Sequence, residues 1–291
     1  MEDLPDRLVV RADPRLYDQL RRLAGDRRMV FFAGLPGTGK SLLVHQLAHL
    51  AETAGRTVHL LQWDVARPVF EASGPARPYP SVNGVTHAVI RKAIGLWVRR
   101  AVAGWDRRHP EPGHLLIGET PLVGHRFVEL ARRLDDAAEA VLGAASACFA
   151  IPVPSRETRR FLEDERERRA ARPRHQQERE DAPAPVVRDL WRQIVAVAPS
   201  LGLPAPPVQD APYDPALYQG VYERVLRHRH TEVVPLATRL PTAALSVHDF
   251  AVPRRDLAPD RDEVPGFIRE IETQYPDPEA LEREIDRWYQ V

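Results

Sequence analysis

The feature that most constrains this chain is a glycine-rich stretch, residues 34–41, that reads Gly-Leu-Pro-Gly-Thr-Gly-Lys-Ser. It matches the pattern G-x-x-x-x-G-K-[ST] at every position, and that pattern has its meaning only between a strand and a helix. The apolar run Met29–Ala33 predicts a buried strand just before it. Apolar residues at helical spacing over residues 40–54, ended by Gly55, predict the helix after it. These residues therefore predict the first half of a βαβ unit.

The following residues continue the alternation of strands and helices. Further strands are expected at residues 57–63, 115–117 and 147–153. Helices are expected at residues 125–134 and, with Thr86 as its cap, from residue 86 to about 103. The proline- and glycine-rich residues after Asp64 are expected to be irregular. This order predicts an α/β fold with three layers, α/β/α, around a mainly parallel sheet.

The character of the chain changes after residue 154. Residues 155–181 are rich in Arg and Glu and predict a solvated helix that Pro173 interrupts. Beyond it, helices are expected at residues 186–198, 215–229, 264–274 and 278–289, and short strands at 244–247 and at 232–236, the latter an edge strand because of Pro235. We divide the chain into a core of residues 1–154, an Arg-rich lid and linker of residues 155–200, and residues 201–291, which either complete the core or form a small helical appendage.

The overall composition excludes several classes of protein. Lys plus Arg equals Asp plus Glu, 41 each, so the net charge disfavours nucleic acid as a partner without excluding it. Cys148 is the only cysteine, so an intrachain disulfide is impossible and a reducing compartment is expected. The sequence shows neither the apolar region of a signal peptide at residues 1–11 nor a stretch suited to span a bilayer. We expect a cytoplasmic protein without membrane contact.

The glycine-rich stretch predicts a binding site for a nucleoside triphosphate. Its backbone N–H groups and the start of the following helix form a cradle for phosphates. Lys40 is expected to reach the β- and γ-phosphates, and the hydroxyl of Ser41 is a suitable ligand for Mg²⁺. The absence of an Asn-Lys-x-Asp string favours ATP over GTP. The expected nucleotide-binding residues are Gly34, Leu35, Pro36, Gly37, Thr38, Gly39, Lys40, Ser41 and Leu42.

Over residues 1–65 the chain resembles the P-loop NTPase superfamily. Asp64 follows the second expected strand and Arg67 comes shortly after it, a layout similar to the small-molecule kinase branch, which includes chloramphenicol phosphotransferase, zeta-toxin and gluconate-kinase-like proteins. In that branch the aspartate is a base or a substrate anchor. The resemblance implies that Asp64 deprotonates or orients an acceptor hydroxyl, while Arg67 can hold an anionic group. The alternative for Asp64 is to cap the next turn.

Other residues are candidates for the metal and acceptor sites. Glu119, after the third expected strand, stands where this superfamily carries a metal-binding acid, usually an aspartate, and is expected to bind Mg²⁺. Related kinases place the acceptor-binding lobe in the helical region that contains His87 and Arg91, so the core is expected to include such an insertion. Arg126 follows a turn and is a third acceptor candidate.

Kinases of this type also close an arginine-bearing lid over the triphosphate, and the Arg-rich helix follows the fourth expected strand as such a lid does. Arg159, Arg160, Arg166 and Arg169 are available there. We expect Arg166 and Arg169 to enter the site and, with Lys40, to neutralise charge on the transferring phosphoryl group. The predicted catalytic residues are therefore Lys40, Asp64, Arg166 and Arg169.

The sequence thus predicts a kinase that transfers the γ-phosphoryl group of Mg-ATP to a hydroxyl of an unidentified small or nucleotide-like acceptor. Two alternatives stay open. One is a nucleotide-switched regulatory ATPase that acts on a protein partner, against which the third strand lacks an Asp-Glu pair. The other is a polynucleotide kinase, which the neutral net charge disfavours.

Overall fold

The computed structural model describes residues 8–82, 84–171, 184–242, 250 and 255–291. Within these residues six strands form one sheet, and all of their pairings are parallel. The strands are β1 (Met29–Ala33), β2 (Thr57–Leu61), β3 (His114–Thr120), β4 (Ala147–Pro154), β5 (Thr231–Leu236) and β6 (Arg255–Asp256). Their order across the sheet is β5-β4-β1-β3-β2-β6. The expected α/β fold with a mainly parallel sheet is confirmed.

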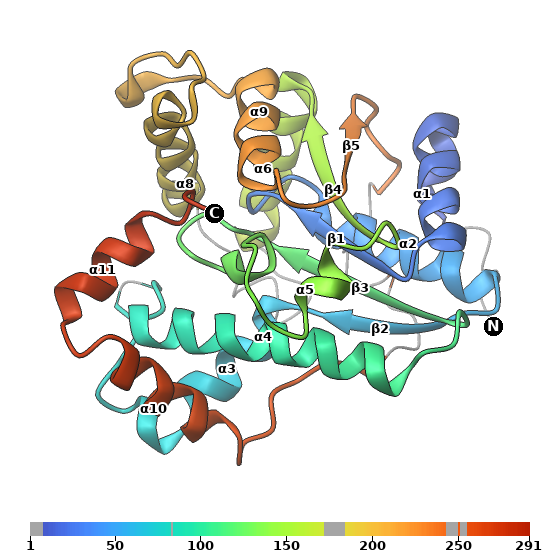
Figure 1. Ribbon diagram of the computed structural model, residues 1–291. Helices are drawn as coiled ribbons and strands as arrows, with labels where there is room; N and C mark the ends of the chain where they lie inside the picture. The colour runs from blue at the N-terminus through green and yellow to red at the C-terminus, as the bar shows by residue number, and fades with distance from the viewer. Residues whose placement is uncertain (1–7, 83, 172–183, 243–249, 251–254) are drawn as a thin grey trace.

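Helices surround this sheet (Figure 1). They are α1 (Pro14–Asp26), α2 (Lys40–Thr53), α3 (Trp63–Glu71), α4 (Ala88–Arg108), α5 (Glu139–Leu142), α6 (Arg156–Ala171), α8 (Ala184–Val197), α9 (Pro215–Val225), α10 (Val264–Gln274) and α11 (Pro278–Asp286). Helix α1 was not expected from the sequence; it begins after Asp13, whose side chain accepts a hydrogen bond from the Leu16 N–H group, with Pro14 at the first helical position. No helix in the described part of the chain is long and apolar enough to cross a membrane.

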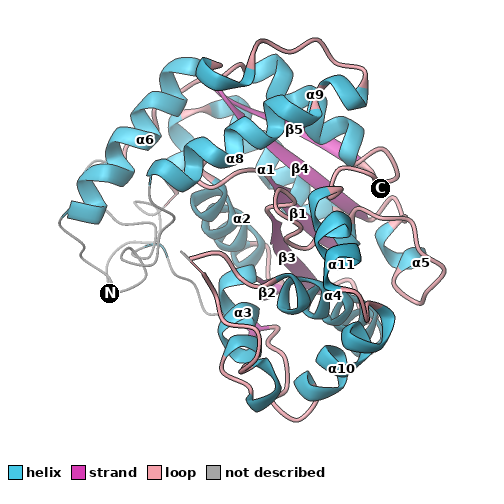
Figure 2. Cartoon of the chain, turned by 90° about the vertical axis from the view of Figure 1, so that its left-hand side faces the viewer, coloured by secondary structure: helices cyan, strands magenta, loops and turns pink. Residues whose placement is uncertain are grey.

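The sheet has a separate apolar core on each face. Every residue of β1 is buried, and its side chains alternate between the two cores. Phe32 packs in the core formed with α1 and α2, whereas Phe31 packs in the larger core formed with α4, α9 and α10. Figure 2 shows α2 and α4 on opposite sides of the strands. The three expected layers are therefore present.

The topology marks one place on the sheet as suited to a ligand. Strand β1 lies between β3 and β4. After β1 the chain continues to β2, on the β3 side of β1, whereas after β3 it continues to β4, on the other side of β1. The first connection contains α2 and covers one face, and the second covers the opposite face. Loops that diverge in this way leave a crevice at the carboxyl ends of β1 and β3, where open α/β sheets bind ligands.

The prediction of a helix at residues 125–134 is wrong. Leu122, His125 and Phe127 have left-handed backbone conformations, with φ near 60°, and Leu122 pairs with Arg126 in an isolated antiparallel bridge. A helix cannot run through such residues. One short 3-10 helix, Val128–Leu130, is what forms there.

The region between β2 and α4 also differs from the expectation. Residues 63–71 were expected to be a strand end followed by irregular chain, but β2 ends at Leu61 and α3 is helical in spite of Pro68. The cap of α4 is His87, whose Nδ1 accepts a hydrogen bond from the Val89 N–H group at 3.2 Å, and not Thr86. Helix α4 continues to Arg108, beyond the predicted end at residue 103.

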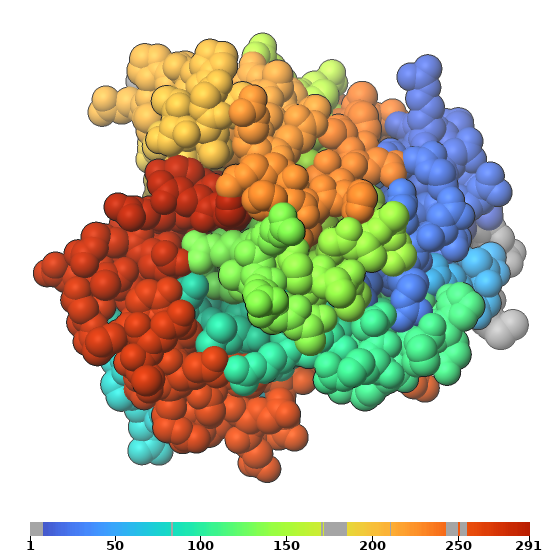
Figure 3. All heavy atoms as spheres, viewed as in Figure 1, coloured from blue at the N-terminus to red at the C-terminus, as the bar shows by residue number. Residues whose placement is uncertain are grey.

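The C-terminal third both extends the sheet and covers it. Strand β5 pairs with β4 at the sheet edge, as Pro235 predicted, and α10 and α11 pack on α4. In the space-filling view these C-terminal residues, red, adjoin the yellow residues of the α8 region and the green residues of α4 (Figure 3). The strand expected at residues 244–247 and the helix interruption at Pro173 lie outside the described residues.

Candidate functional site

The glycine-rich loop lies at the predicted crevice, between the end of β1 and the start of α2. Gly37 and Gly39 have φ values of 74° and 85°, which side chains rarely tolerate. Gly34 donates its N–H to the Thr120 carbonyl oxygen at 3.3 Å, and a Cβ atom on Gly34 would lie 2.5 Å from the Tyr218 hydroxyl oxygen. The three glycines are thus required by the backbone path and by a close neighbour.

Lys40 is the first residue of α2 and is buried. Its Nζ donates a hydrogen bond to the Leu35 carbonyl oxygen at 2.8 Å, inside the loop. Burial lowers the pKa of Lys40 to about 8, and Glu119 and Asp64 oppose this change. An ammonium group held in poorly solvated surroundings at a helix start is well placed to bind an anion. Ser41, the next residue, is exposed at the same helix start.

Glu119 belongs to β3 and lies opposite Phe32 of β1. Its neighbour Gly118 lies inside the same strand, where a Cβ atom would come within 2.5 Å of the Phe31 ring. Burial and the charge of Asp64 raise the pKa of Glu119 to about 7, although Lys40 and a backbone hydrogen bond from Trp63 lower it. A carboxyl group with this pKa can bind a cation or exchange a proton near neutral pH.

Asp64 lies in the first turn of α3, with its side chain at the surface beside Glu119. Arg126 is close to both carboxylates, which favour its charged form, although burial lowers its pKa. Arg67 is also near Arg126, and its Nη1 pairs with Glu71 at 2.9 Å. The structure therefore brings Lys40, Asp64 and Glu119 together with Arg126, and Arg67 lies next to Arg126.

Helix α6 carries arginines to the outer side of the loop. Arg159 is buried, donates a hydrogen bond from Nη1 to the Pro36 carbonyl oxygen at 3.2 Å, and pairs with Glu163 at 2.7 Å. The Arg166 guanidinium lies 3.5 Å from the position of a Cβ atom on Gly37. Arg169, the other expected lid residue, pairs with Glu165 at 3.9 Å. Arg159 and Arg166 are thus two arginines of α6 that lie against the loop.

Tyrosines from α9 support the site, and the sequence analysis missed them. The Tyr218 hydroxyl accepts a hydrogen bond from the Leu35 N–H group at 3.2 Å, and burial raises the pKa of Tyr218 to about 12. Tyr222, one helical turn later, donates to the Pro121 carbonyl oxygen at 3.0 Å. The spacing of these two residues by four was the one signal that they share a helix face.

A pocket of about 340 Å³ is large enough for a small molecule, and its link to the carboxylates is Arg126, which lines the pocket and is close to Asp64 and Glu119. Arg91 and Arg126 both line it, and Arg91 donates a hydrogen bond to the Gly124 carbonyl oxygen at 2.8 Å. Residues of α8 and α11 form the other walls. His87, the remaining acceptor candidate, is not in the lining and caps α4 instead. A larger hollow, of about 690 Å³, lies at α1 and the end of α2 and contains none of the predicted site residues.

A buried ion network holds the turn that carries Arg126. Glu129 accepts hydrogen bonds from Lys92 at 3.0 Å and from His125 at 2.8 Å, with all three side chains buried. Gly95 of α4 makes room, since a Cβ atom there would overlap the Glu129 carboxyl group. The network fixes the left-handed turn and, through it, the position of Arg126.

Similarity to known proteins adds nothing to this geometry. No family model matches the chain, and no curated protein or solved structure is detectably similar to it. Function must therefore be inferred from the site itself, because a fold alone supports many activities.

Proposed function

We propose that this protein is an ATP-dependent phosphotransferase that acts on a small acceptor carrying a negatively charged group. The observation that carries the proposal is the convergence of Lys40, two carboxylates and several arginines at the carboxyl ends of β1 and β3, next to a pocket. Phosphoryl transfer needs positioning and charge neutralisation more than covalent chemistry from the protein. This convergence supplies both.

The loop residues fit a polyphosphate. The glycines leave a cradle that side chains would fill, and Lys40 and the start of α2 add positive charge. Ser41 and Glu119 would hold Mg²⁺, and the raised pKa of Glu119 indicates a carboxyl group that a cation would help to ionise. Bound ATP would supply the phosphoryl group, and bound Mg²⁺ would help to neutralise the charge of the phosphates. Arg159 and Arg166 add guanidinium groups on the outer side of the loop.

The acceptor would occupy the pocket. The pocket is lined by two guanidinium groups, Arg91 and Arg126, as well as by the carboxylates of Asp189 and Asp286. An anionic substituent would bind on the arginine side, where charge-assisted hydrogen bonds are strong. Asp64, beside Arg126, would accept the proton of the acceptor hydroxyl as it attacks the phosphorus. The pocket favours this activity over a regulatory ATPase, which has no need of an acceptor site, and its size favours a small acceptor over a polynucleotide.

The proposal is tested with γ-labelled ATP, Mg²⁺ and a cell-extract metabolite pool separated into anionic and neutral fractions. We expect label to enter a compound of the anionic fraction. Asp64→Asn should remove most of this transfer while binding of a non-hydrolysable ATP analogue persists. Arg126→Gln should weaken transfer to the anionic acceptor, whereas its matched control Arg100→Gln, on the exposed surface of α4, should behave as the wild type.

Other results would contradict the proposal in different ways. Hydrolysis of ATP without an acceptor, unchanged by the metabolite pool but stimulated by a protein, would indicate the regulatory ATPase. Label on oligonucleotide ends would indicate the polynucleotide kinase. Failure of the ATP analogue to bind would remove the nucleotide site itself.

A further inference from the structure

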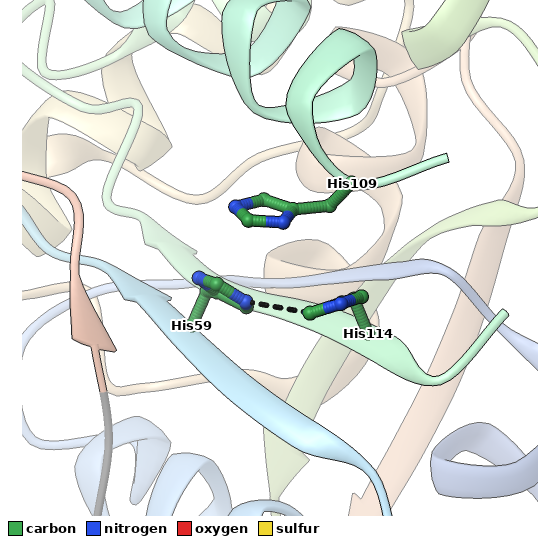
Figure 4. A group of neighbouring side chains, drawn as sticks. All are labelled: His59, His109 and His114. Atoms are coloured by element: carbon green, nitrogen blue, oxygen red, sulfur yellow. Dashed lines mark hydrogen bonds between the residues drawn. The ribbon is translucent and has the colours of Figure 1, made fainter. Parts of the chain in front are cut away.

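Three histidines meet at the other end of the sheet. His59 is in β2, His114 is the first residue of β3, and His109 ends α4. One ring nitrogen of each lies within 4.8 Å of the other two. Figure 4 shows the rings of His59 and His114 approaching each other, with His109 beside both. A strand rises about 3.3 Å per residue, so His114 lies roughly 17 Å from Glu119, far from the proposed phosphate site.

The three rings are held together by elements that are distant in the sequence. Strands β2 and β3 are paired neighbours, and the register joins Thr57 to His114 and His59 to Leu116, so both histidines share one sheet face. The N–H group of His109 donates to the Trp105 carbonyl oxygen at 3.0 Å, which ties this histidine to the end of α4. Trp105 also packs its ring against His59 and His109. The arrangement is therefore built into the fold.

The spacing of the ring nitrogens suits a metal ion. Nε2 of His59 and Nδ1 of His114 are 3.0 Å apart. Two ligands at about 2.0 Å from a tetrahedral zinc ion are about 3.3 Å from each other, so this pair is nearly at the required separation. The third nitrogen, from His109, lies within 4.8 Å of these two, and its ring would have to turn for all three nitrogens to face one ion. Without an ion, one of the first two nitrogens must carry a hydrogen and donate a hydrogen bond to the other.

For two of the proposed ligands, His59 and His109, the surroundings favour the neutral form, which is the form that binds metals. Burial, and then the neighbouring rings of His109 and His114, lower the pKa of His59 to about 4. Burial and His114 likewise lower the pKa of His109. Arg108 and Arg255 act in the same direction, whereas Glu111, whose Oε2 lies 3.9 Å from His114 Nε2, supplies negative charge.

We propose that His59, His109 and His114 bind a divalent transition-metal ion, Zn²⁺ by the chemistry of three imidazoles, with a fourth position left for water or Glu111. The ion would link the segment that connects α4 to β3, which carries His109 and His114, to His59 of β2. Its role is structural, since the described site residues of the proposed kinase lie at the carboxyl ends of β1 and β3, at the opposite end of the strands. This proposal does not rest on the proposed function.

The test is a calorimetric titration of chelator-treated protein with ZnCl₂, followed by thermal unfolding with and without Zn²⁺. We expect one ion per chain, a higher melting temperature with Zn²⁺, and a visible d–d spectrum of tetrahedral Co²⁺ when CoCl₂ is used. His109→Ala should weaken Zn²⁺ binding by at least about 100-fold, because even outer partners of metal ligands are worth about 10- to 100-fold. His228→Ala, at an exposed histidine outside the cluster, should bind as the wild type does.

His109 is chosen because it is less buried than His59, whose replacement risks the fold. His114→Asn is the second variant, and both should keep the far-ultraviolet circular dichroism of the wild type. Absence of stoichiometric binding to the wild type, or binding by His109→Ala and His114→Asn as tight as that of His228→Ala, would overturn the metal site. The titration is made without nucleotide, so its result is independent of kinase activity.

Discussion

Glu119 and Glu129 are both buried, only ten positions apart in the sequence, and yet their surroundings shift their pKa values in opposite directions. Burial and Asp64 raise the pKa of Glu119 to about 7 against the influence of Lys40. Burial alone would also raise the pKa of Glu129, but the charges of His125 and Lys92 outweigh it and hold the pKa well below its usual range.

The difference lies in the charges that surround each carboxylate. Lys92 and His125 both donate to one oxygen of Glu129, Oε1, within 3.0 Å, although its Oε2 is buried without a hydrogen-bond partner. Glu119 instead shares its surroundings with a second carboxylate. A buried charge held by opposite charges serves the fold, and one that is poorly compensated marks a functional site. We therefore expect changes around Glu129 to affect stability and changes around Glu119 to affect activity.

The largest expected effect is on stability and comes from Lys92→Met. The variant leaves Glu129 buried without its ammonium partner, which typically costs about 3–5 kcal/mol of unfolding free energy. Chemical denaturation at pH 7 measures this loss, with the exposed Arg100→Met on the same helix as control.

The pH dependence of that loss follows from the sign of the pKa shift. The folded-state pKa of Glu129 is depressed, so the stability it contributes is present above its ordinary pKa of 4.5 and is lost as the pH falls. The difference between the wild type and Lys92→Met should therefore shrink in acid. A difference that stays the same at every pH would mean that Lys92 acts only by packing.

The next effect is on activity and comes from the equivalent change beside Glu119. Lys40→Met should lower phosphoryl transfer by about 100- to 1,000-fold, the range for removal of one charge-stabilising donor. Its unfolding free energy should stay within about 1 kcal/mol of the wild type, because Glu119 can take up a proton when the ammonium is gone. Single-turnover transfer and denaturation of the same sample measure both. A loss of stability as large as that of Lys92→Met would break the contrast between the two regions.

The sequence predicts the Glu119 region better than the Glu129 region for a physical reason. Residues 34–41 form a local motif, and the rule that strand ends meet at one edge brings Asp64 and Glu119 to it. Strong patterns likewise gave β1, α2 and α10 with correct or nearly correct bounds. Each of these inferences uses information contained in a few consecutive residues.

The turn that bears Arg126 could not be predicted in this way. Leu122, His125 and Phe127 adopt left-handed conformations that glycine usually adopts, so no local signal announces them. They are held by tertiary contacts such as the network of Glu129 with Lys92. Contacts between distant segments, such as that of Tyr218 with Leu35 or those among the three histidines, could not be predicted either, because they also depend on tertiary structure and have no local signal.

The smallest expected effect, and the most direct comparison of the two glutamates, is that of Glu119→Gln on stability. The pKa of Glu119 is raised from an ordinary value of 4.5 to about 7, so the folded wild type holds a proton that the unfolded chain has released between these pH values. Its stability therefore falls relative to the variant as the pH rises through this window, and the full penalty is present above pH 7.

Without nucleotide or Mg²⁺, Glu119→Gln should match the wild type near pH 4.5 and be more stable at pH 8 by roughly 1–3 kcal/mol, because a pKa rise from 4.5 to about 7 corresponds to at most about 3 kcal/mol. Glutamine can keep the hydrogen bond from Trp63, so packing changes little. Thermal unfolding at the two pH values measures the difference, and Glu129→Gln is the matched control. Because the pKa of Glu129 is lowered, that control should be less stable than the wild type at pH 8, the opposite sign. Equal signs for the two variants would show that burial alone, and not the pairing of each carboxylate, decides their behaviour.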